Sequence, residues 1–271
     1  MADRVDAAPP SAMDLQSEFV ELGLPVNSIY LVHCSMRRLG PLSGGAATLL
    51  QVLHRVLGPR STIVVPAFTA RNSTTTRRFR SRIVGMTPAQ ATAEEARIEG
   101  FDTAVTPAQD VGAFAEFLRR RAGAVRSDHP QTSFAALGGA ASTLMRDHPL
   151  ECPLGERSPL GKLYSADALV LQIGARLDHA CTCFHLAEHR LPRPAARRMH
   201  RAYVIESGRR RLLEFMAADL DDSDFALLGD AMRAQTGSVR CGPVGRGTAS
   251  WFSLREAVDF AADWMTRCRT S

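Results

Sequence analysis

The feature that most restricts the fold is an amphipathic helical segment between two short apolar runs. Residues 29–32 (IYLV) and 61–65 (STIVV) are each typical of a buried β-strand, and residues 46–57 carry apolar side chains at helical spacing. A helix between two strands indicates that the strands pair in parallel, because parallel strands need a long crossover connection, which is usually a helix. Residues 168–173 (ALVLQI) predict another buried strand. This order predicts an α/β fold with a mixed, largely parallel central sheet flanked by helices.

The remaining sequence predicts one domain after a short irregular start. A chain of 271 residues with 45% hydrophobic content can bury a large core. The polar, proline-containing residues 1–13 are expected to be disordered, and residues 14–271 to form a single α/β domain. The glycine-rich residues 241–250 are expected to form a loop. Apolar spacing and turn residues predict further helices at 14–22, 109–120, 139–147, 221–235 and 254–268, and a hairpin at 203–213.

The balance of charge narrows the class of partner. A net charge of +5 favours an anionic partner. The aromatic content is only 6% and no nucleic-acid motif occurs, which argues against nucleic acid and leaves a phosphate-bearing cofactor such as coenzyme A. The sequence has neither an apolar run of about 18 residues nor an apolar signal core. We therefore expect no membrane segment and a cytoplasmic location.

A basic insertion at about 71–100 interrupts the regular pattern. Residues 73–82 are polar and rich in arginine and are expected to form an exposed loop, followed by a polar helix over 88–99. The insertion is either a solvated segment without a catalytic role or a flap over an anionic ligand.

The sequence HLAE provides the main candidate for chemistry. His185 and Glu188 lie three residues apart, so a helix that begins near His185 would place both on one face. A carboxylate that orients an imidazole is a common device for accepting a proton near pH 7. The pair follows the predicted strand at 168–173, whose carboxyl end is where α/β proteins bind ligands.

Two other kinds of site compete for the same segment. His179, Cys181, Cys183 and His185 alternate, but in an extended chain they would span about 20 Å, too far for one tetrahedral metal ion. We therefore predict no metal site. The other alternative is a cysteine nucleophile, which could be Cys34, Cys181 or Cys183, with a histidine base.

Two further groups of residues could contact an anion. Ser35, Gly40, Gly44 and Gly45 precede the predicted helix at 46–57, where they form either a phosphate cradle or a simple strand-to-helix turn. The segment that contains Arg126, Ser127, His129 and Ser133 could line a ligand channel, or it could be a capped loop.

Several ordered stretches over about residues 14–268 together resemble one known family. They are LVHCSMRRLGPLSGGAATLL, STIVVPAF, FDTAVTPAQDVGAFAEFLRRRAGAVRSDHPQTSFAALG, ERSPLGKLYSADALVLQIGA, CTCFHLAEHRLP and GPVGRGTASWFSLREAVDF. The chain thereby resembles the aminoglycoside 3-N-acetyltransferases, also called antibiotic N-acetyltransferases. The resemblance implies this family's own α/β fold, not the GNAT fold, with acetyl-CoA as donor and a small-molecule amine as acceptor.

The resemblance also assigns roles to residues. It implies that His185, supported by Glu188 and with His129 nearby, prepares the amine. Thr182 is a candidate for contact with the developing oxyanion. The residues implied to lie along the CoA channel are Ser35, Met36, Gly40, Leu42, Gly44, Gly45, Arg126, Ser127 and Ser133.

Departures from the family pattern leave the identity of the acceptor amine undecided. Cys181 and Cys183 stand where the family usually has asparagine and serine, and Cys34 replaces a serine. Asp102 and Asp178 could supply acid for a cationic antibiotic. Transfer to an aminoglycoside is the family default; a biosynthetic transfer to a smaller or anionic natural-product amine and a non-catalytic CoA-binding or amine-binding role are the alternatives. The oligomeric state also stays open, a homodimer included.

Overall fold

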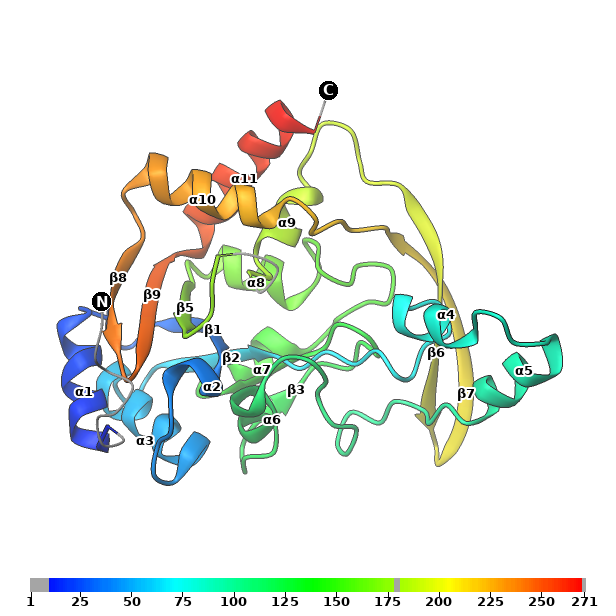
Figure 1. Cartoon of the computed structure of the whole chain (residues 1–271), viewed down its shortest axis with the longest axis horizontal. Helices are drawn as coiled ribbons and strands as arrows, with labels where there is room; N and C mark the ends of the chain where they lie inside the picture. Colours follow the sequence, from blue (N-terminus) through cyan, green and yellow to red (C-terminus); the bar gives the residue numbers. More distant parts are fainter. Residues whose placement is uncertain (1–9, 178–180, 270–271) are drawn as a thin grey trace.

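The computed structural model of the chain describes residues 10–177 and 181–269. Within these residues the main sheet has seven strands in the order β3-β4-β2-β1-β5-β9-β8 (Figure 1). Its central strand β1 (Ile29–Cys34) pairs in parallel with β2 (Thr62–Pro66) on one side and with β5 (Leu169–Ile173) on the other. Helix α3 (Gly45–Leu57) connects β1 to β2, which confirms the predicted strand–helix–strand unit.

Antiparallel strands complete the sheet on both sides. Strand β4 (Phe134–Leu137) pairs with β2, and the short β3 (Val125–Arg126) pairs with β4. On the opposite side β9 (Gly247–Ser253) pairs with β5, and β8 (Arg240–Val244) pairs with β9. The predicted α/β class with a mixed sheet is confirmed, and the parallel pairs lie at its centre.

Helices cover both faces of the sheet because successive strand residues point to opposite sides. Tyr30 and Val32 enter one apolar core, whereas Leu31 between them enters the other. The first core also contains residues of α1 (Ala12–Glu21), α3 and α6 (Ala113–Arg119). The second core contains residues of five other helices: α7 (Ala141–Met145), α8 (Pro159–Ser165), α9 (Phe184–Glu188), α10 (Phe225–Thr236) and α11 (Leu254–Cys268).

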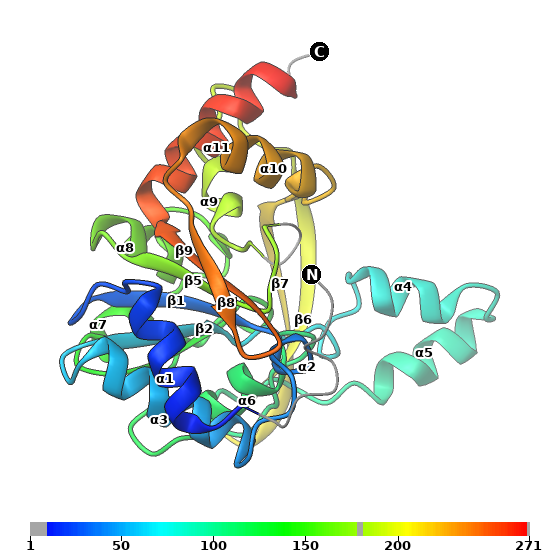
Figure 2. The same cartoon turned by 60° about the vertical axis from the view of Figure 1, so that its left-hand side comes forward.

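The basic insertion forms a helical hairpin beside a second, two-stranded sheet. Strands β6 (Arg197–Glu206) and β7 (Arg209–Ala218) make this sheet, which confirms the predicted hairpin turn and extends its strands. Helices α4 (Arg77–Ile83) and α5 (Pro88–Ala96) project from the body of the molecule (Figure 2). The Tyr203 hydroxyl donates to Glu95 Oε1 at 2.6 Å, which ties the hairpin of helices to the second sheet.

Capping side chains explain two corrections to the sequence predictions. Helix α1 begins at Ala12, because Ser11 and Asp14 form a capping box, so the expected disorder does not reach residue 13. Residues 1–9 lie outside the described part of the chain. The predicted loop at 73–82 is helical from Arg77, because the Thr76 hydroxyl accepts from the Phe79 N–H and Phe79 is buried.

Two further differences from the sequence predictions involve glycine residues. Residues 241–250 form most of the β8–β9 hairpin instead of a loop, with Gly245 in the turn at φ 60° and Val244 and Ala249 packed into the core. Helix α6 starts at Ala113, later than the predicted residue 109, because Gly112 lies at φ 89°. The other predicted helices are present with ends that differ by a few residues. Among the described residues no helix is both long and apolar enough to span a membrane.

Candidate active site

His185 and Glu188 form a direct pair on α9. The helix places them on one face, and His185 Nδ1 lies 2.6 Å from Glu188 Oε2. The Glu188 side chain is 2% exposed and that of His185 is 15% exposed, so the carboxylate is buried behind a partly accessible ring. This confirms the predicted spacing of the two side chains and fixes the orientation of the imidazole.

A second layer of contacts holds Glu188. Its Oε1 accepts from Arg269 Nη1 at 2.8 Å and from the Asp221 backbone N–H at 2.9 Å. Arg269, the C-cap residue of α11, also pairs with Asp224, and its hydrogen bonds to Asp224 and Glu188 raise the pKa of Arg269. The Phe225 ring lies 4.8 Å from the His185 ring between centroids. No sequence pattern pointed to these contacts, because they join segments that are distant along the chain.

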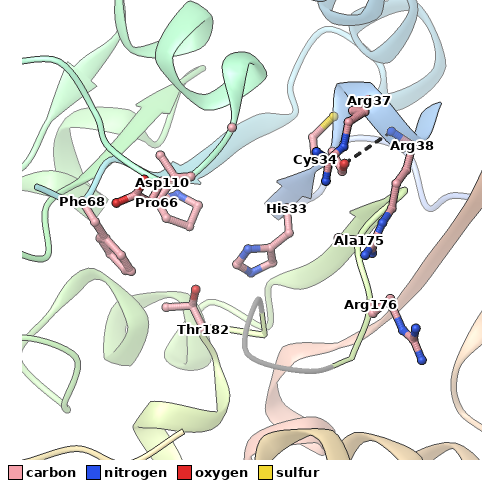
Figure 3. A pocket seen from close by; sticks show the side chains of 13 residues that line it. His33, Cys34, Arg37, Arg38, Pro66, Phe68, Asp110, Ala175, Arg176 and Thr182 are labelled. Atoms are coloured by element: carbon pink, nitrogen blue, oxygen red, sulfur yellow. Dashed lines mark hydrogen bonds between the residues drawn. The ribbon is translucent and has the colours of Figure 1, made fainter. Parts of the chain in front are cut away.

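A cavity of about 550 Å³ opens at the carboxyl ends of β1 and β2 (Figure 3). Thr182 lines this cavity, and its carbonyl accepts from the His185 N–H at 3.1 Å, so His185 lies on the helix that starts at the cavity wall. The position agrees with the predicted crevice after the strand at 168–173. The cavity is lined by His33, Cys34, Ser35, Arg37, Arg38, Pro66, Phe68, Asp110, Val111, Gly112, Ala175, Arg176 and Thr182.

Cationic side chains in the wall suit a phosphate-bearing cosubstrate. Arg37 and Arg38 come from the short helix α2 (Met36–Leu39), and Arg176 comes from the segment after β5. Arg38 Nη1 also donates to the Gly174 carbonyl at 3.4 Å, which anchors that side chain at the rim. Guanidinium groups bind phosphate oxygens well, so these residues could hold the anionic part of CoA.

Only Ser35 of the first predicted cofactor group lines the cavity. Its hydroxyl accepts from the Arg38 N–H and caps α2. Gly40 and Gly44 adopt φ of 94° and 75°, and a Cβ at Gly40 would lie 2.9 Å from Arg246. These two positions therefore require glycine for the backbone path. The other members are Gly45, which starts α3, and Met36 and Leu42, which pack against the core.

The second predicted cofactor group is engaged within the protein. Arg126 donates to Ser133 Oγ and to the carbonyls of Ala67, Thr103 and Thr106. Ser133 Oγ in turn donates to the Ala67 carbonyl at 2.7 Å. A direct contact of these side chains with CoA would require an exchange of these bonds, and their cofactor role stays a prediction.

Ser127 and His129 belong to a buried histidine cluster. Ser127 Oγ lies 3.0 Å from His148 Nδ1, and the rings of His129 and His148 are 4.7 Å apart. His129 Nε2 lies 3.2 Å from the Leu150 carbonyl oxygen, and burial lowers the pKa of His129 to about 3. The structure therefore places His129 in the packing of a loop, and a role beside His185 is not visible in its contacts.

The cysteines of the site are buried. Cys181 Sγ and Cys183 Sγ lie 3.5 Å apart, and both residues are fully buried. Burial raises the pKa of Cys34 to about 12, so its thiol stays protonated near neutral pH. Because the thiolate is the nucleophile, this environment disfavours an acyl-enzyme on Cys34. Among the described residues no group of three or more His, Cys, Asp or Glu side chains could hold a metal ion.

A second cavity, of about 1020 Å³, adjoins the first through Asp110, which lines both. Asp102, predicted to bind substrate, lines this second cavity, and its Oδ1 accepts from the Ala104 N–H at 2.8 Å. Glu99 adds acid, whereas Arg71 and Arg210 add positive charge. Asp178, the other predicted substrate residue, lies outside the described residues.

His33, the fifth residue of β1, was not among the predicted site residues. The residue is buried at 7% exposure and lines the first cavity, where its ring projects into the space near Thr182 (Figure 3). A signal was available, because a histidine at the carboxyl end of an otherwise apolar strand is unusual for a core position.

The comparisons with known proteins agree with this architecture. The family model described as aminoglycoside 3-N-acetyltransferase matches residues 31–266. The chain belongs to the aminoglycoside 3-N-acetyltransferase family. It is 33% identical to the prophage-derived aminoglycoside N(3')-acetyltransferase-like protein YokD of Bacillus subtilis, over 94% of this chain and 92% of YokD. It is 32% identical to aminoglycoside N(3)-acetyltransferase VII of Streptomyces paromomycinus, over 95% of this chain and 92% of that protein.

Solved structures of this family share the fold. The crystal structure of YokD matches with a TM-score of 0.89 and 31% identity, over 98% of this chain and 96% of that one. The structure of AAC-IIIb with CoASH matches with a TM-score of 0.82 and 27% identity, over 95% and 97% of the two chains. As a member of the aminoglycoside 3-N-acetyltransferase family, the chain is a CoA-dependent N-acetyltransferase with acetyl-CoA as donor. This confirms the resemblance seen in the sequence motifs.

Proposed function

We propose that this enzyme transfers the acetyl group of acetyl-CoA to an amine of an aminoglycoside, with His185 as general base. The observation that carries the proposal is the 2.6 Å contact between His185 Nδ1 and the buried Glu188 carboxylate. When Nδ1 donates to Glu188, the other ring nitrogen is left as the proton acceptor. The chain from Arg269 through Glu188 to His185 thus holds the imidazole in one tautomer.

The proposed chemistry needs a base because an alkylammonium has no lone pair. His185 takes the proton, and Glu188 stabilises the imidazolium that results. The freed amine then forms a C–N bond to the thioester carbon, and the C–S bond breaks with its electron pair on the CoA sulfur. The imidazolium returns its proton to the thiolate or to solvent. No covalent enzyme intermediate is required, which agrees with the buried, protonated thiol of Cys34.

The acceptor assignment rests on the relatives and on the second cavity. Aminoglycoside N(3)-acetyltransferases of several types are similar to this chain over most of its length. The acidic residues Glu99, Asp102 and Asp110 line the second cavity, which adjoins the first. Carboxylates attract the ammonium groups of an aminoglycoside.

A transfer assay tests the proposal. The purified enzyme is mixed with acetyl-CoA and gentamicin-, kanamycin- or paromomycin-type amines, and release of free CoA thiol is followed. We expect turnover with at least one of these amines and a loss of about 100-fold or more in His185→Ala, the range for a general base. The surface variant His54→Ala, from an exposed position of α3, is the matched control and should keep full activity. Full activity of His185→Ala would remove the base assignment.

One observation favours a second acceptor class. Arg71 and Arg210 line the same cavity as the acidic residues. Arg78 and Arg82 of α4 line a smaller pocket that shares Arg71 with this cavity. Mixed charge suits a smaller amine that also carries an anionic group. The same assay with amino-acid, nucleoside and phosphonate amines decides between the classes: turnover here without turnover of aminoglycosides supports a biosynthetic role.

A further inference from the structure

A row of buried polar side chains crosses the sheet beside the first cavity. His33 of β1 is paired in register with Gln172 of β5, and Gln172 is paired with Ser250 of β9. All three are buried, at 7%, 0% and 5% exposure respectively. A buried polar group costs free energy unless it has a hydrogen-bond partner, so each member of the row needs an explanation.

Two members of the row are satisfied within the protein. Ser250 Oγ donates to Gln172 Oε1 at 3.4 Å, and Gln172 Nε2 donates to the Arg176 carbonyl at 3.1 Å. His33 differs, because its buried Nε2 has no hydrogen-bond partner among the described residues. A leucine or phenylalanine at this position would avoid that cost. The histidine is therefore not explained by the packing of the core.

The cavity offers a reason for the histidine. The His33 ring projects from the end of β1 into the space bounded by Phe68, Ala175 and Thr182 (Figure 3). Thr182 immediately precedes the α9 region that carries His185 and Glu188. The imidazole thus lies in the same cavity wall as a hydroxyl predicted to meet the reacting carbonyl.

The protonation state of His33 limits what it can do. Burial lowers the pKa of His33 to about 4, so the ring is neutral near pH 7. A neutral imidazole carries one N–H donor and one acceptor nitrogen. A proton shuttle in the neutral range is therefore unsuitable for this ring, whereas a fixed hydrogen bond to an uncharged group is suitable.

We propose that His33 is a further catalytic residue of acetyl transfer, whose N–H donates a hydrogen bond to the acyl carbonyl oxygen of the bound thioester. This inference rests on the proposed function. As the C–N bond forms, the π electrons of the carbonyl move to its oxygen, and the His33 N–H stabilises the resulting oxyanion. The pair returns as the C–S bond breaks and the thiolate leaves. His33 neither gains nor loses a proton, since His185 holds the one removed from the amine.

An infrared measurement tests the contact without any acceptor amine. Acetyl-CoA labelled with ¹³C at the carbonyl is bound to the wild-type enzyme, to His33→Phe and to His33→Gln. A hydrogen bond to the carbonyl lowers its stretching frequency. We expect a lowered frequency in the wild-type enzyme, little lowering in His33→Phe, and partial recovery in His33→Gln, whose amide keeps a donor. Equal frequencies in the wild-type enzyme and His33→Phe would overturn the proposal. Because no amine is present, this result does not depend on the identity of the acceptor.

Kinetics and stability complete the test. With an amine that the wild-type enzyme acetylates, kcat of His33→Phe should fall about 100-fold, as expected when one oxyanion donor is removed. The thermal midpoint of this variant should be unchanged or higher, because an unpartnered buried group has been removed. Ser250→Ala, from the same buried row but outside the cavity wall, is the matched control and should keep kcat. If no amine is turned over by the wild-type enzyme, the proposed function fails, while the infrared result still decides the role of His33.

Discussion

Arg269 Nη1 donates to Glu188 Oε1 at 2.8 Å across a separation of 81 residues. The contact links the C-terminal end of α11 to the short helix that carries the proposed base. Because the same carboxylate contacts His185 through its other oxygen, Arg269 helps to hold the proposed base. Under the proposed mechanism, the stability of this contact and the rate of acetyl transfer should therefore change together.

Replacement of Arg269 should lower both the stability and the rate of acetyl transfer. Arg269→Met leaves the Glu188 side chain, which is 2% exposed, without the arginine that pairs with it. We expect the free energy of unfolding to fall by about 3 kcal/mol, because a buried charge loses its partner. The turnover should fall together with the stability, because the orientation of Glu188 is loosened. Arg267→Met, which breaks an exposed pair with Asp263 on the same helix, should change stability by about 0.5 kcal/mol or less. Urea titrations and thiol-release rates of the two variants check this; equal stability of both would contradict it.

The carboxylate itself should matter more for rate than for binding. Glu188→Gln preserves size and can still hydrogen-bond to His185, but it removes the negative charge that stabilises the imidazolium. We expect kcat to fall about 10- to 100-fold, within the range for a general acid–base partner, with little change in the KM for acetyl-CoA. Steady-state rates at saturating amine give the answer. A fall in affinity for acetyl-CoA without a fall in kcat would place Glu188 in donor binding instead.

The buried histidine cluster should make the fold sensitive to acid. Burial lowers the pKa of His129 to about 3 and that of His148 to about 4, both below the unfolded value of about 6.5. The unfolded chain therefore binds more protons below pH 6.5, and stability is present above that pH and lost as the pH falls toward 4. Each histidine should contribute a slope of up to about 1.4 kcal/mol per pH unit in this window.

Urea denaturation between pH 4.5 and 8 measures this slope. In His148→Gln the slope of the unfolding free energy against pH, between pH 6 and 5, should be smaller than in the wild type by up to about 1.4 kcal/mol per pH unit. This difference is expected whatever the overall loss of stability. A wild-type stability that is flat from pH 7 to 5 would show that the cluster is not buried in its neutral form.

Thiol chemistry should separate the buried cysteines from the exposed ones. Cys241 and Cys268 are exposed, whereas the remaining four are buried. A thiol reagent should therefore modify two cysteines rapidly in the native protein and all six after denaturation.

Incubation with acetyl-CoA alone should leave the intact mass unchanged, because burial keeps the Cys34 thiol protonated. A mass increase of one acetyl group on a buried cysteine would revive the acyl-enzyme alternative.

Much of the framework could be predicted from local patterns. The apolar runs at β1, β2 and β5 and the helical spacing at α3 and α11 predict these elements, because burial of one face imposes a period on the sequence. The hairpin β8–β9 was missed because its glycines suggest a loop, while its pairing with β5 supplies the missing stability. Likewise Arg126 suggests an anion site, but its donors serve backbone carbonyls that only the folded chain brings near.

The sequence by itself determined the strand–helix–strand unit and the pairing of His185 with Glu188, since residues three apart on a helix must share a face. The tertiary structure alone decided that Arg269 and the Asp221 amide hold Glu188, that His129 packs in a loop, and that His33 faces the cavity. The physical reason is the range of the interactions. Backbone geometry fixes neighbours within a turn, whereas contacts between distant segments depend on how whole helices and strands pack around two cores.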